Sequence, residues 1–361
     1  MVVSENKVLS AARKCLEKNI PFALYLFPDE DNMHFCSSSK TIKVSIRDFF
    51  EKSVSGTFAI APFVPSDTIE IITPDFEPDY VIAIDEVLET KPGTELPVET
   101  TFEDYSLTGN EIIEQLKREG GKVVLSRVIV EKGIDPVSIA VDYFNALPST
   151  FRSLFYTPER GIWLGATPEL LASYSLENNS LTTMSLAGTR PLGISEKWDS
   201  KNIEEHNFVT DFIKKVLSPN CDIVKVSDLF SIKYGLVEHL CEIIQANGIS
   251  DISEIISGLS PTPAVCGTPR NVALETINKY ESHSRECYGG WLGVKCGIET
   301  KAFVNLRCAK IFCGEKNGEY IYNVYAGGGF TAKSIVKEEW EEAGQKASTL
   351  LKILKTSRID G

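Results

Sequence analysis

An acidic residue interrupts the apolar stripe of a helix predicted at residues 196–217. The stripe runs from Val209 to Val216. Glu205 lies four residues before Val209, about one helical turn, and therefore on the same face. Burial of an unpaired carboxylate is costly, so a cation or a metal ion opposite Glu205 would explain this placement. The alternative is that Glu205 lies at the solvated start of the stripe, and the spacing leaves both interpretations open.

A second helix, predicted at 333–355, carries Glu339, Glu342 and Lys346 on one face. Their spacing places the three side chains within roughly 60° of one another around the helix axis. Two carboxylates beside an apolar stripe suit a hard cation such as Mg²⁺, which prefers oxygen ligands. The alternative is a surface Glu–Lys pair, and the spacing alone favours that alternative.

Few other patterns in the chain indicate a particular chemistry. The glycine run 327–329 lies before the last helix, where its N–H groups would suit an anion, although such runs are more often only tight loops. The sequence has no phosphate-binding glycine motif and no GxSxG nucleophile motif. With four histidines in the whole chain, a multi-histidine metal site is hard to assemble.

Composition excludes several classes of protein. The 361 residues include 37 Lys and Arg and 50 Asp and Glu, and the net charge of −13 opposes non-specific binding to nucleic acid or an anionic membrane. The 43% hydrophobic and 24% charged fractions are those of a globular protein. Nine cysteines without CxxC spacing and the absence of a signal peptide or a long apolar run predict reduced thiols, no membrane span and a cytoplasmic location.

The elements that must position these residues are many short strands and a few long helices. This pattern predicts an α+β fold with large antiparallel sheets, and the length alone suggests about two domains. Residues 86–106 are predicted to be a surface connection. Helices are predicted at 5–18, 107–118, from the Asp135 N-cap, at 196–217 and at 333–355; strands at 22–27, 56–64, 122–131, 151–156, 162–164, 171–174, 181–186, 222–226, 232–238, 288–295, 302–313 and 319–326, with a hairpin joining Tyr25 to Phe35.

A series of short motifs follows in order through residues 105–355. These are Lys122-Val-Val-Leu-Ser-Arg127, Gly165-Ala-Thr-Pro-Glu-Leu170, Ala187-Gly-Thr-Arg-Pro191, Glu205-His206, His239-Leu240, Pro261-Thr-Pro-Ala-Val-Cys-Gly267, Arg285-x-x-Tyr288-Gly-Gly290, Leu306-Arg307, Ala326-Gly-Gly-Gly329 and Glu339-Trp-x-Glu342-x-x-x-Lys346. In this order they resemble the chorismate-utilising enzymes. That family includes isochorismate and salicylate synthases and the large components of anthranilate and aminodeoxychorismate synthases.

The resemblance implies one large domain over residues 1–361 in place of the two that length suggests. Residues 1–104 form its divergent N-terminal part and residues 105–355 its catalytic core. The implied fold is α+β, with two antiparallel sheets packed face to face and helices on the outside.

The resemblance also implies a role for each matching residue. Glu205, Glu339 and Glu342 would hold Mg²⁺, directly or through water, and the ion would hold the ring carboxylate of the substrate. Glu169 would protonate the departing C4 hydroxyl, and Lys122 would activate water for attack at C2. Residues implied to bind or line the substrate, several through backbone N–H groups, are Gly188, Thr189, His239, Ala264, Tyr288, Arg307, Gly327, Gly329 and Lys346.

Several of these residues have a simpler structural explanation. Lys122 fits a solvated strand end, Glu169 an acidic first-turn residue, and His239 a histidine satisfied in the core. His206 points to another helix face than Glu205 and is left out of the site. His34 and His283 lie in polar segments and receive no role.

Three positions discriminate among members of the family. Lys122 accompanies the water-using members, whereas ammonia-using members usually carry glutamine there. Ala187 replaces the lysine nucleophile of aminodeoxychorismate synthases, which excludes a covalent route and makes a glutamine amidotransferase partner unexpected. Ala264 stands where salicylate formers tend to carry a hydroxyl group, while Phe330 departs from the usual aliphatic residue.

The sequence therefore predicts an isomerase, a Mg²⁺-dependent isochorismate synthase acting on chorismate. Menaquinone biosynthesis is the first expected pathway and siderophore biosynthesis the second. The alternatives are a salicylate synthase, an anthranilate synthase large component and a non-catalytic chorismate-binding protein; retention of Lys122 and Glu169 disfavours the last. The expected protein is a monomer or weak homodimer with no nucleic-acid or membrane partner.

Overall fold

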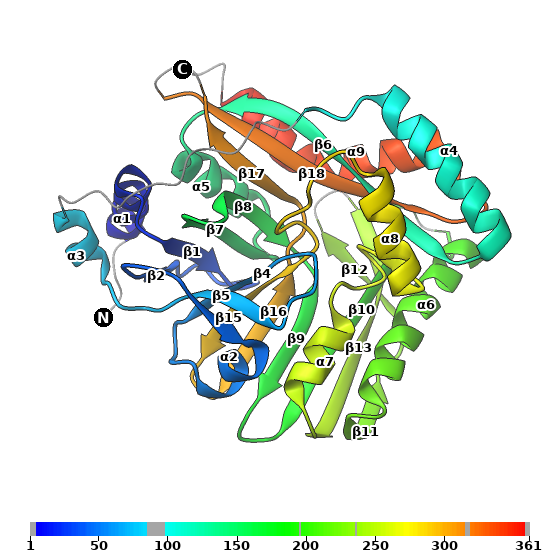
Figure 1. The fold of residues 1–361 in the computed structure, drawn as a ribbon, viewed down its shortest axis with the longest axis horizontal. Helices are drawn as coiled ribbons and strands as arrows, with labels where there is room; N and C mark the ends of the chain where they lie inside the picture. The colour runs from blue at the N-terminus through cyan, green and yellow to red at the C-terminus, as the bar shows by residue number, and fades with distance from the viewer. Residues whose placement is uncertain (1–4, 85–97, 195, 235–236, 315–317, 358–361) are drawn as a thin grey trace.

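Strands from all parts of the chain pair into two antiparallel sheets (Figure 1). The computed structural model describes residues 5–84, 98–194, 196–234, 237–314 and 318–357. The first sheet has the order β14 (Gly267–Thr268), β6 (Lys122–Gly133), β18 (Tyr320–Phe330), β17 (Cys308–Cys313), β8 (Gly161–Thr167), β7 (Phe151–Thr157), β1 (Phe22–Leu26) and β2 (His34–Ser37). The second has the order β11 (Cys221–Val226), β13 (Val237–Ile249), β10 (Ser180–Pro191), β9 (Leu170–Ser175), β16 (Glu299–Val304), β15 (Trp291–Cys296), β4 (Phe58–Ala61), β5 (Thr68–Ile72) and β3 (Ile42–Ser45), with β12 (Phe230–Tyr234) paired to β13.

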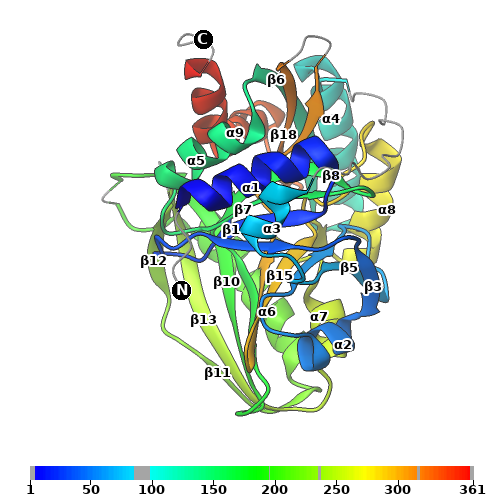
Figure 2. The ribbon, with the colours of Figure 1, turned by 90° about the vertical axis from the view of Figure 1, so that its left-hand side faces the viewer.

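Helices cover the outer faces of both sheets. The core beneath α1 (Glu5–Lys18), α3 (Pro78–Ala83), α5 (Pro136–Ala146) and α9 (Val336–Thr356) belongs to the first sheet, and that beneath α2 (Ile46–Lys52), α6 (Ser200–Leu217) and α7 (Ile252–Leu259) to the second. Figure 2 separates α1, α5 and α9, above, from α2 and α7, below. The helices α4 (Phe102–Glu119) and α8 (Arg270–Tyr280) pack beside β6. No helix in the described ranges is both long and apolar enough to cross a bilayer.

The two sheets are held face to face by an aromatic core. Phe151 of β7 stacks on Phe303 of β16 with ring centroids 4.2 Å apart and an interplanar angle of 1°. The ring centroids of Phe58 in β4 and Phe155 in β7 lie 5.8 Å apart, again across the interface between the sheets. Burial of such rings contributes much of the energy of a core, so this contact fixes the separation of the two layers. The predicted fold class, two antiparallel sheets packed face to face with outer helices, is confirmed.

Two of the points at which the chain passes from one sheet to the other lie side by side. After β8 it crosses at Pro168 and Glu169 to β9, and after β16 it crosses back at 305–307 to β17. The backbone N–H of Val304 donates to the carbonyl of Glu169 at 3.0 Å, and that of Ala166 donates to the carbonyl of Arg307 at 3.4 Å. These bonds hold the two crossings side by side.

The single strand predicted at 302–313 is therefore wrong. It is two strands, β16 and β17, in different sheets, and Arg307 between them has a φ of 48°. Apolar residues continue across the break because the strands on both sides of it are buried. The alternation of apolar and polar residues therefore gives no sign that the chain changes sheet here.

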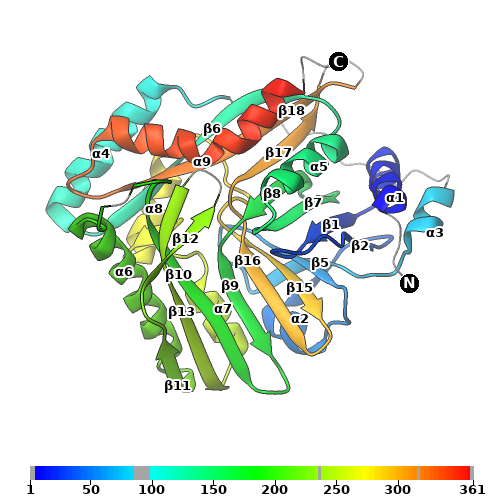
Figure 3. The same cartoon turned by 180° about the vertical axis from the view of Figure 1, so that it is seen from behind.

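The glycine run 327–329 is not a turn but the end of β18, where Gly328 pairs with Leu125 of β6. A Cβ atom on Gly328 would lie 2.8 Å from the carbonyl oxygen of Glu339 in α9. One on Gly329 would lie 2.9 Å from Cε of Lys122. The glycines are therefore required by the close approach of α9 and of the Lys122 side chain to this strand. Figure 3 shows α9 crossing β18 and β6.

Capping explains where the predicted helix boundaries hold and where they shift. Helix 5–18 is found as predicted, and Asp135 caps α5 by accepting from the Val137 N–H at 3.0 Å. Thr101 caps α4, which starts earlier than predicted. Asp199 caps α6, so that helix begins at residue 200. Of the predicted connection 86–106, residues up to 97 lie outside the described residues, and its last part is the start of α4.

Candidate active site

A cavity of about 690 Å³ lies where β6 and β18 meet α6, α9 and the two crossings between the sheets. Every residue predicted for the site lines it. They are Lys122, Glu169, Gly188, Thr189, Glu205, His239, Ala264, Tyr288, Arg307, Gly327, Gly329, Glu339, Glu342 and Lys346. The fold thus brings residues that span more than 200 positions of the sequence to one cavity. The role of each residue stays a prediction.

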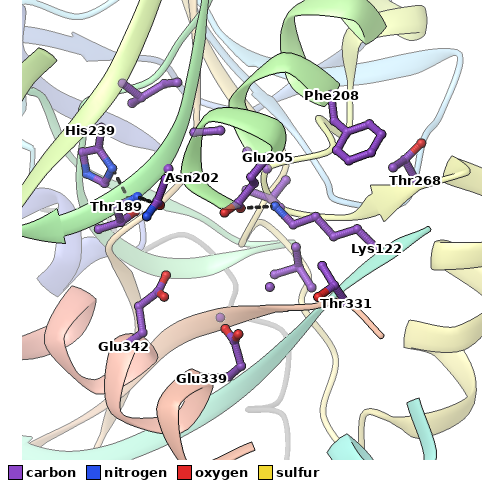
Figure 4. Close-up of a pocket in the computed structure, with 18 of the residues that line it drawn as sticks. Lys122, Thr189, Asn202, Glu205, Phe208, His239, Thr268, Thr331, Glu339 and Glu342 are labelled. Atoms are coloured by element: carbon purple, nitrogen blue, oxygen red, sulfur yellow. Dashed lines mark hydrogen bonds and ion pairs between the residues drawn. The ribbon is translucent and has the colours of Figure 1, made fainter. Parts of the chain in front are cut away.

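Lys122 and Glu205 form an ion pair inside the cavity, with Nζ 2.5 Å from Oε1 (Figure 4). Lys122 is only 6% exposed, so it is not a solvated strand end. The absence of a side chain at Gly329 leaves room for it. The cation that lies opposite the carboxylate on the α6 stripe is therefore this lysine.

Glu169 is buried at the first crossing, before strand β9 rather than in the first turn of a helix. Burial raises the pKa of its carboxyl group to about 7, although the Thr262 hydroxyl and the charge of Lys122 act in the opposite direction. The Thr262 hydroxyl donates to Glu169 Oε1 at 3.1 Å. A carboxyl group with such a pKa holds its proton in part of the molecules near neutral pH, so it can act as a general acid.

His239 connects two cavity residues as a neutral ring. A guanidinium has only donors, so Arg307 Nη2 donates to His239 Nε2, at 3.2 Å. The proton of the ring is then on Nδ1, which donates to Thr189 Oγ1 at 3.0 Å. Burial and the charges of Arg307 and Lys346 lower the pKa of His239 to about 3. His239 is thus a satisfied buried histidine, and it also lines the cavity.

Lys346 adds another fixed cation. Its Nζ lies 2.8 Å from Glu342 Oε1 and donates to the carbonyl of Gly327 at 3.2 Å. Burial lowers the pKa of Lys346, but the neighbouring Glu342 carboxylate outweighs it and the net shift is upward. Lys346 and Arg307 therefore offer two charged donors to an anion in the cavity.

The three carboxylates suggested for Mg²⁺ lie on both sides of the cavity. Glu205 comes from α6, and Glu339 and Glu342 come from α9 and face it (Figure 4). An all-oxygen donor set fits a hard cation in type. Among the described residues, however, no three His, Cys, Asp or Glu side chains are grouped closely enough to hold a metal ion. In this arrangement Glu205 binds Lys122, Glu342 binds Lys346, and Glu339 accepts from the Ser334 hydroxyl at 2.9 Å.

Among the lining residues that the sequence did not predict for the site, two lie on α6 beside Glu205. Asn202 accepts a hydrogen bond from the Thr189 backbone N–H at 3.0 Å, so in this arrangement that N–H is already paired. Phe208 lines the cavity although it is 53% exposed. Neither belongs to a quoted motif; the only available signal was that both lie within one turn of Glu205.

The histidines excluded from the site lie elsewhere. His206 is buried with Nε2 3.0 Å from Glu242 Oε2, on another face of α6 than the cavity. His283 is buried as well, in spite of its polar sequence neighbours, and lies 2.8 Å from the Ser126 hydroxyl.

The family model described as chorismate binding enzyme matches residues 84–352. The vibriobactin-specific isochorismate synthase of Vibrio cholerae serotype O1 is 27% identical over 81% of this chain and 78% of that protein. Isochorismate synthase MenF of Haemophilus influenzae is 31% identical over 56% of this chain, which covers 48% of MenF. The crystal structure of a putative 2,3-dihydroxybenzoate-specific isochorismate synthase, DhbC from Bacillus anthracis, shares the fold, with a TM-score of 0.76 and 24% identity over 96% of this chain and 99% of that one.

The raised pKa of Glu169 predicts a pH dependence of stability. Because burial raises it from 4.5 to about 7, the folded state binds this proton more tightly than the unfolded chain. The linked stability is complete below pH 4.5 and is lost as the pH rises through about 7. Relative to Glu169→Gln, the wild-type free energy of unfolding should fall by about 3 kcal/mol across that range. Urea unfolding of both proteins at several pH values measures this difference, and parallel profiles would contradict it.

Proposed function

This chain belongs to the family of chorismate binding enzymes, and we propose that within it the protein is an isochorismate synthase. The observation that carries the proposal is the pair of proton-transfer groups on one cavity. Glu169 is buried with a pKa near neutrality, and Lys122, whose charge acts on Glu169, lines the same cavity. An acid and a base on one enclosed site suit an exchange of hydroxyl groups.

The proposed reaction adds water at C2 of chorismate and removes the C4 hydroxyl as water, with a shift of the ring double bonds. Lys122 accepts the proton of the attacking water, and Glu169 gives its proton to the departing oxygen. One water enters and one leaves, so the reaction is an isomerisation. A lysine accepts a proton only as the neutral amine, and in this structure Lys122 is paired with the Glu205 carboxylate. The reactive state therefore requires that Glu205 change its partner.

The cations of the cavity suit a substrate with two carboxylates. Arg307 and Lys346 are each held by neighbours, Arg307 by His239 and Lys346 by Glu342. Fixed donors lose little freedom on binding, which favours recognition of a carboxylate. We propose that Mg²⁺ is bound by Glu205, Glu339 and Glu342, where it would neutralise and hold the ring carboxylate of the substrate.

The residues lining the cavity also support water rather than ammonia as the nucleophile. Lys122 stands where ammonia-using members of the family usually carry glutamine. Ala187 lines the cavity and offers no nucleophile, which supports a non-covalent route without an amidotransferase partner. Ala264, also at the cavity, supports a reaction that stops before loss of pyruvate.

The pathway is part of the proposal. We place the enzyme in menaquinone biosynthesis, the pathway that the sequence analysis expects first. Siderophore biosynthesis is the second candidate, and the similarity to the vibriobactin-specific isochorismate synthase of Vibrio cholerae supports it.

Product analysis tests the reaction directly. Purified protein incubated with chorismate and Mg²⁺ should form isochorismate, resolved by chromatography, with no release of pyruvate. Addition of ammonium should not yield anthranilate, because the proposed site activates water. Pyruvate with salicylate would indicate the lyase alternative, and anthranilate without isochorismate would refute the proposal.

The acid and the base can be separated from binding by substitution. Lys122→Ala and Glu169→Gln should each lower kcat by roughly 10² or more while chorismate binding, measured by calorimetry, is retained. Lys132→Ala is a matched control, because Lys132 lies on the same strand and pairs with Glu319 at 2.7 Å but is well exposed. Full activity of either site variant would remove the role assigned to that residue.

The metal set has its own test on α9. Glu342→Ala should abolish either the Mg²⁺ dependence of turnover or the activity itself, because it removes a proposed ligand. Glu341→Ala, at the exposed neighbouring position that contacts Lys337, should behave as the wild type. Mg²⁺ binding followed by calorimetry without substrate gives a second readout. A wild-type enzyme that turns over at full rate in chelator would overturn the assignment of all three carboxylates.

A further inference from the structure

One side chain ties the start of α6 to strand β10. Asn202 Oδ1 accepts from the Thr189 backbone N–H at 3.0 Å, and Asn202 Nδ2 donates to Asp199 Oδ2 at 2.7 Å. The backbone N–H of Asn202 donates to the other oxygen of Asp199 at 2.8 Å. Asn202 is therefore bonded on one side to the helix cap and on the other to the strand.

The strand is irregular at the point of contact. The register between β10 and β13 shifts between Ala187 and Thr189, and Gly188 lies in the shift with a φ of 76°. A Cβ atom on Gly188 would lie 3.1 Å from the carbonyl oxygen of Asn202 and 3.3 Å from its Cβ. An irregularity of this kind disrupts the ladder of backbone bonds. Asn202 packs against it and supplies the acceptor that the Thr189 N–H requires.

This link joins two parts of the cavity. Beyond Thr189, the chain of hydrogen bonds continues through His239 to the guanidinium of Arg307. On the helix side, Glu205 follows Asn202 by three residues, so both lie on one face, and both line the cavity (Figure 4).

We propose that Asn202 is a positioning residue, which fixes Glu205 relative to the Thr189–His239–Arg307 chain. The inference rests on the proposed function, since it assigns Arg307 to the substrate carboxylate. Without the amide, Thr189 loses its acceptor and the first turn of α6 loses its connection to β10. The strongest effect should fall on substrate binding, because Arg307 lies at the end of the chain.

The decisive variants exchange the two polar residues of the link. Asn202→Ala should raise KM for chorismate about tenfold, the effect of losing one net hydrogen bond, with a smaller change in kcat. Asn202→Asp keeps an acceptor for Thr189 but places a second carboxylate beside Asp199, so KM should rise as well. The double variant Asp199→Asn, Asn202→Asp restores every donor and acceptor and should return KM to within about threefold of wild type. Asn207→Ala, exposed on the same helix, is the control.

Hydrogen exchange of the Thr189 amide supplies a readout that does not depend on turnover. The amide should be protected in the wild type and the double variant and lose protection in Asn202→Ala. A wild-type KM in Asn202→Ala, or tighter binding of chorismate because the amide N–H is released, would overturn the proposal. So would a double variant that folds but keeps a tenfold raised KM. Failure of the wild type to form isochorismate would instead refute the proposed function, while the exchange data would still report on the link.

Discussion

The backbone bonds from Val304 to Glu169 and from Ala166 to Arg307 join two segments, each of which passes from one sheet to the other. A crossing between packed sheets leads the chain through the interior, so a side chain there is surrounded by both layers. That position allows Glu169 to be buried with a raised pKa, and it places Arg307 directly before β17, at the same cavity. The two sheets that the chain joins here are packed together by rings such as those of Phe151 and Phe303, whose centroids are 4.2 Å apart.

Much of the fold could be predicted because its local signals agree with its tertiary contacts. Asp135 with Pro136, and the turn after Tyr25, mark an N-cap and a hairpin that the structure contains. The break at Arg307 could not be predicted, since the residues on both sides are equally apolar. Likewise the glycines at 327–329 are governed by the distance to α9 and Lys122, which no local pattern records.

The same distinction applies to the site. The resemblance identified residues that line one cavity, and the helix spacing alone had favoured a surface pair for Glu342 and Lys346. That pair exists, but it lies at the cavity. The Lys122–Glu205 pair joins positions 83 residues apart, so spacing within a single helix could not identify its cation. The contacts of Asn202 were equally hidden, because they depend on an irregular strand pairing far from it in sequence.

The excess of acid in the chain does not oppose an anionic ligand at this cavity. With a net charge of −13, long-range repulsion is screened over about 8 Å at physiological salt. Within the cavity, the two cations Lys122 and Lys346 are each matched by a carboxylate, and Arg307 is bonded to a neutral histidine. The local field in the cavity is thus set by these groups rather than by the total charge.

The N-terminal strands lie at the margins of both sheets: β1 and β2 continue the first beyond β7, and β3, β4 and β5 continue the second beyond β15. This part carries few of the family motifs, yet it covers strand edges that would otherwise present unpaired N–H and C=O groups to other molecules. The sequence of this part can therefore vary as long as its strands still pair and pack. Removal of these strands would expose the edges of β7 and β15, with unpaired backbone groups that could pair with other chains. The N-terminal strands therefore belong to the same two sheets as the cavity, and they fold together with them.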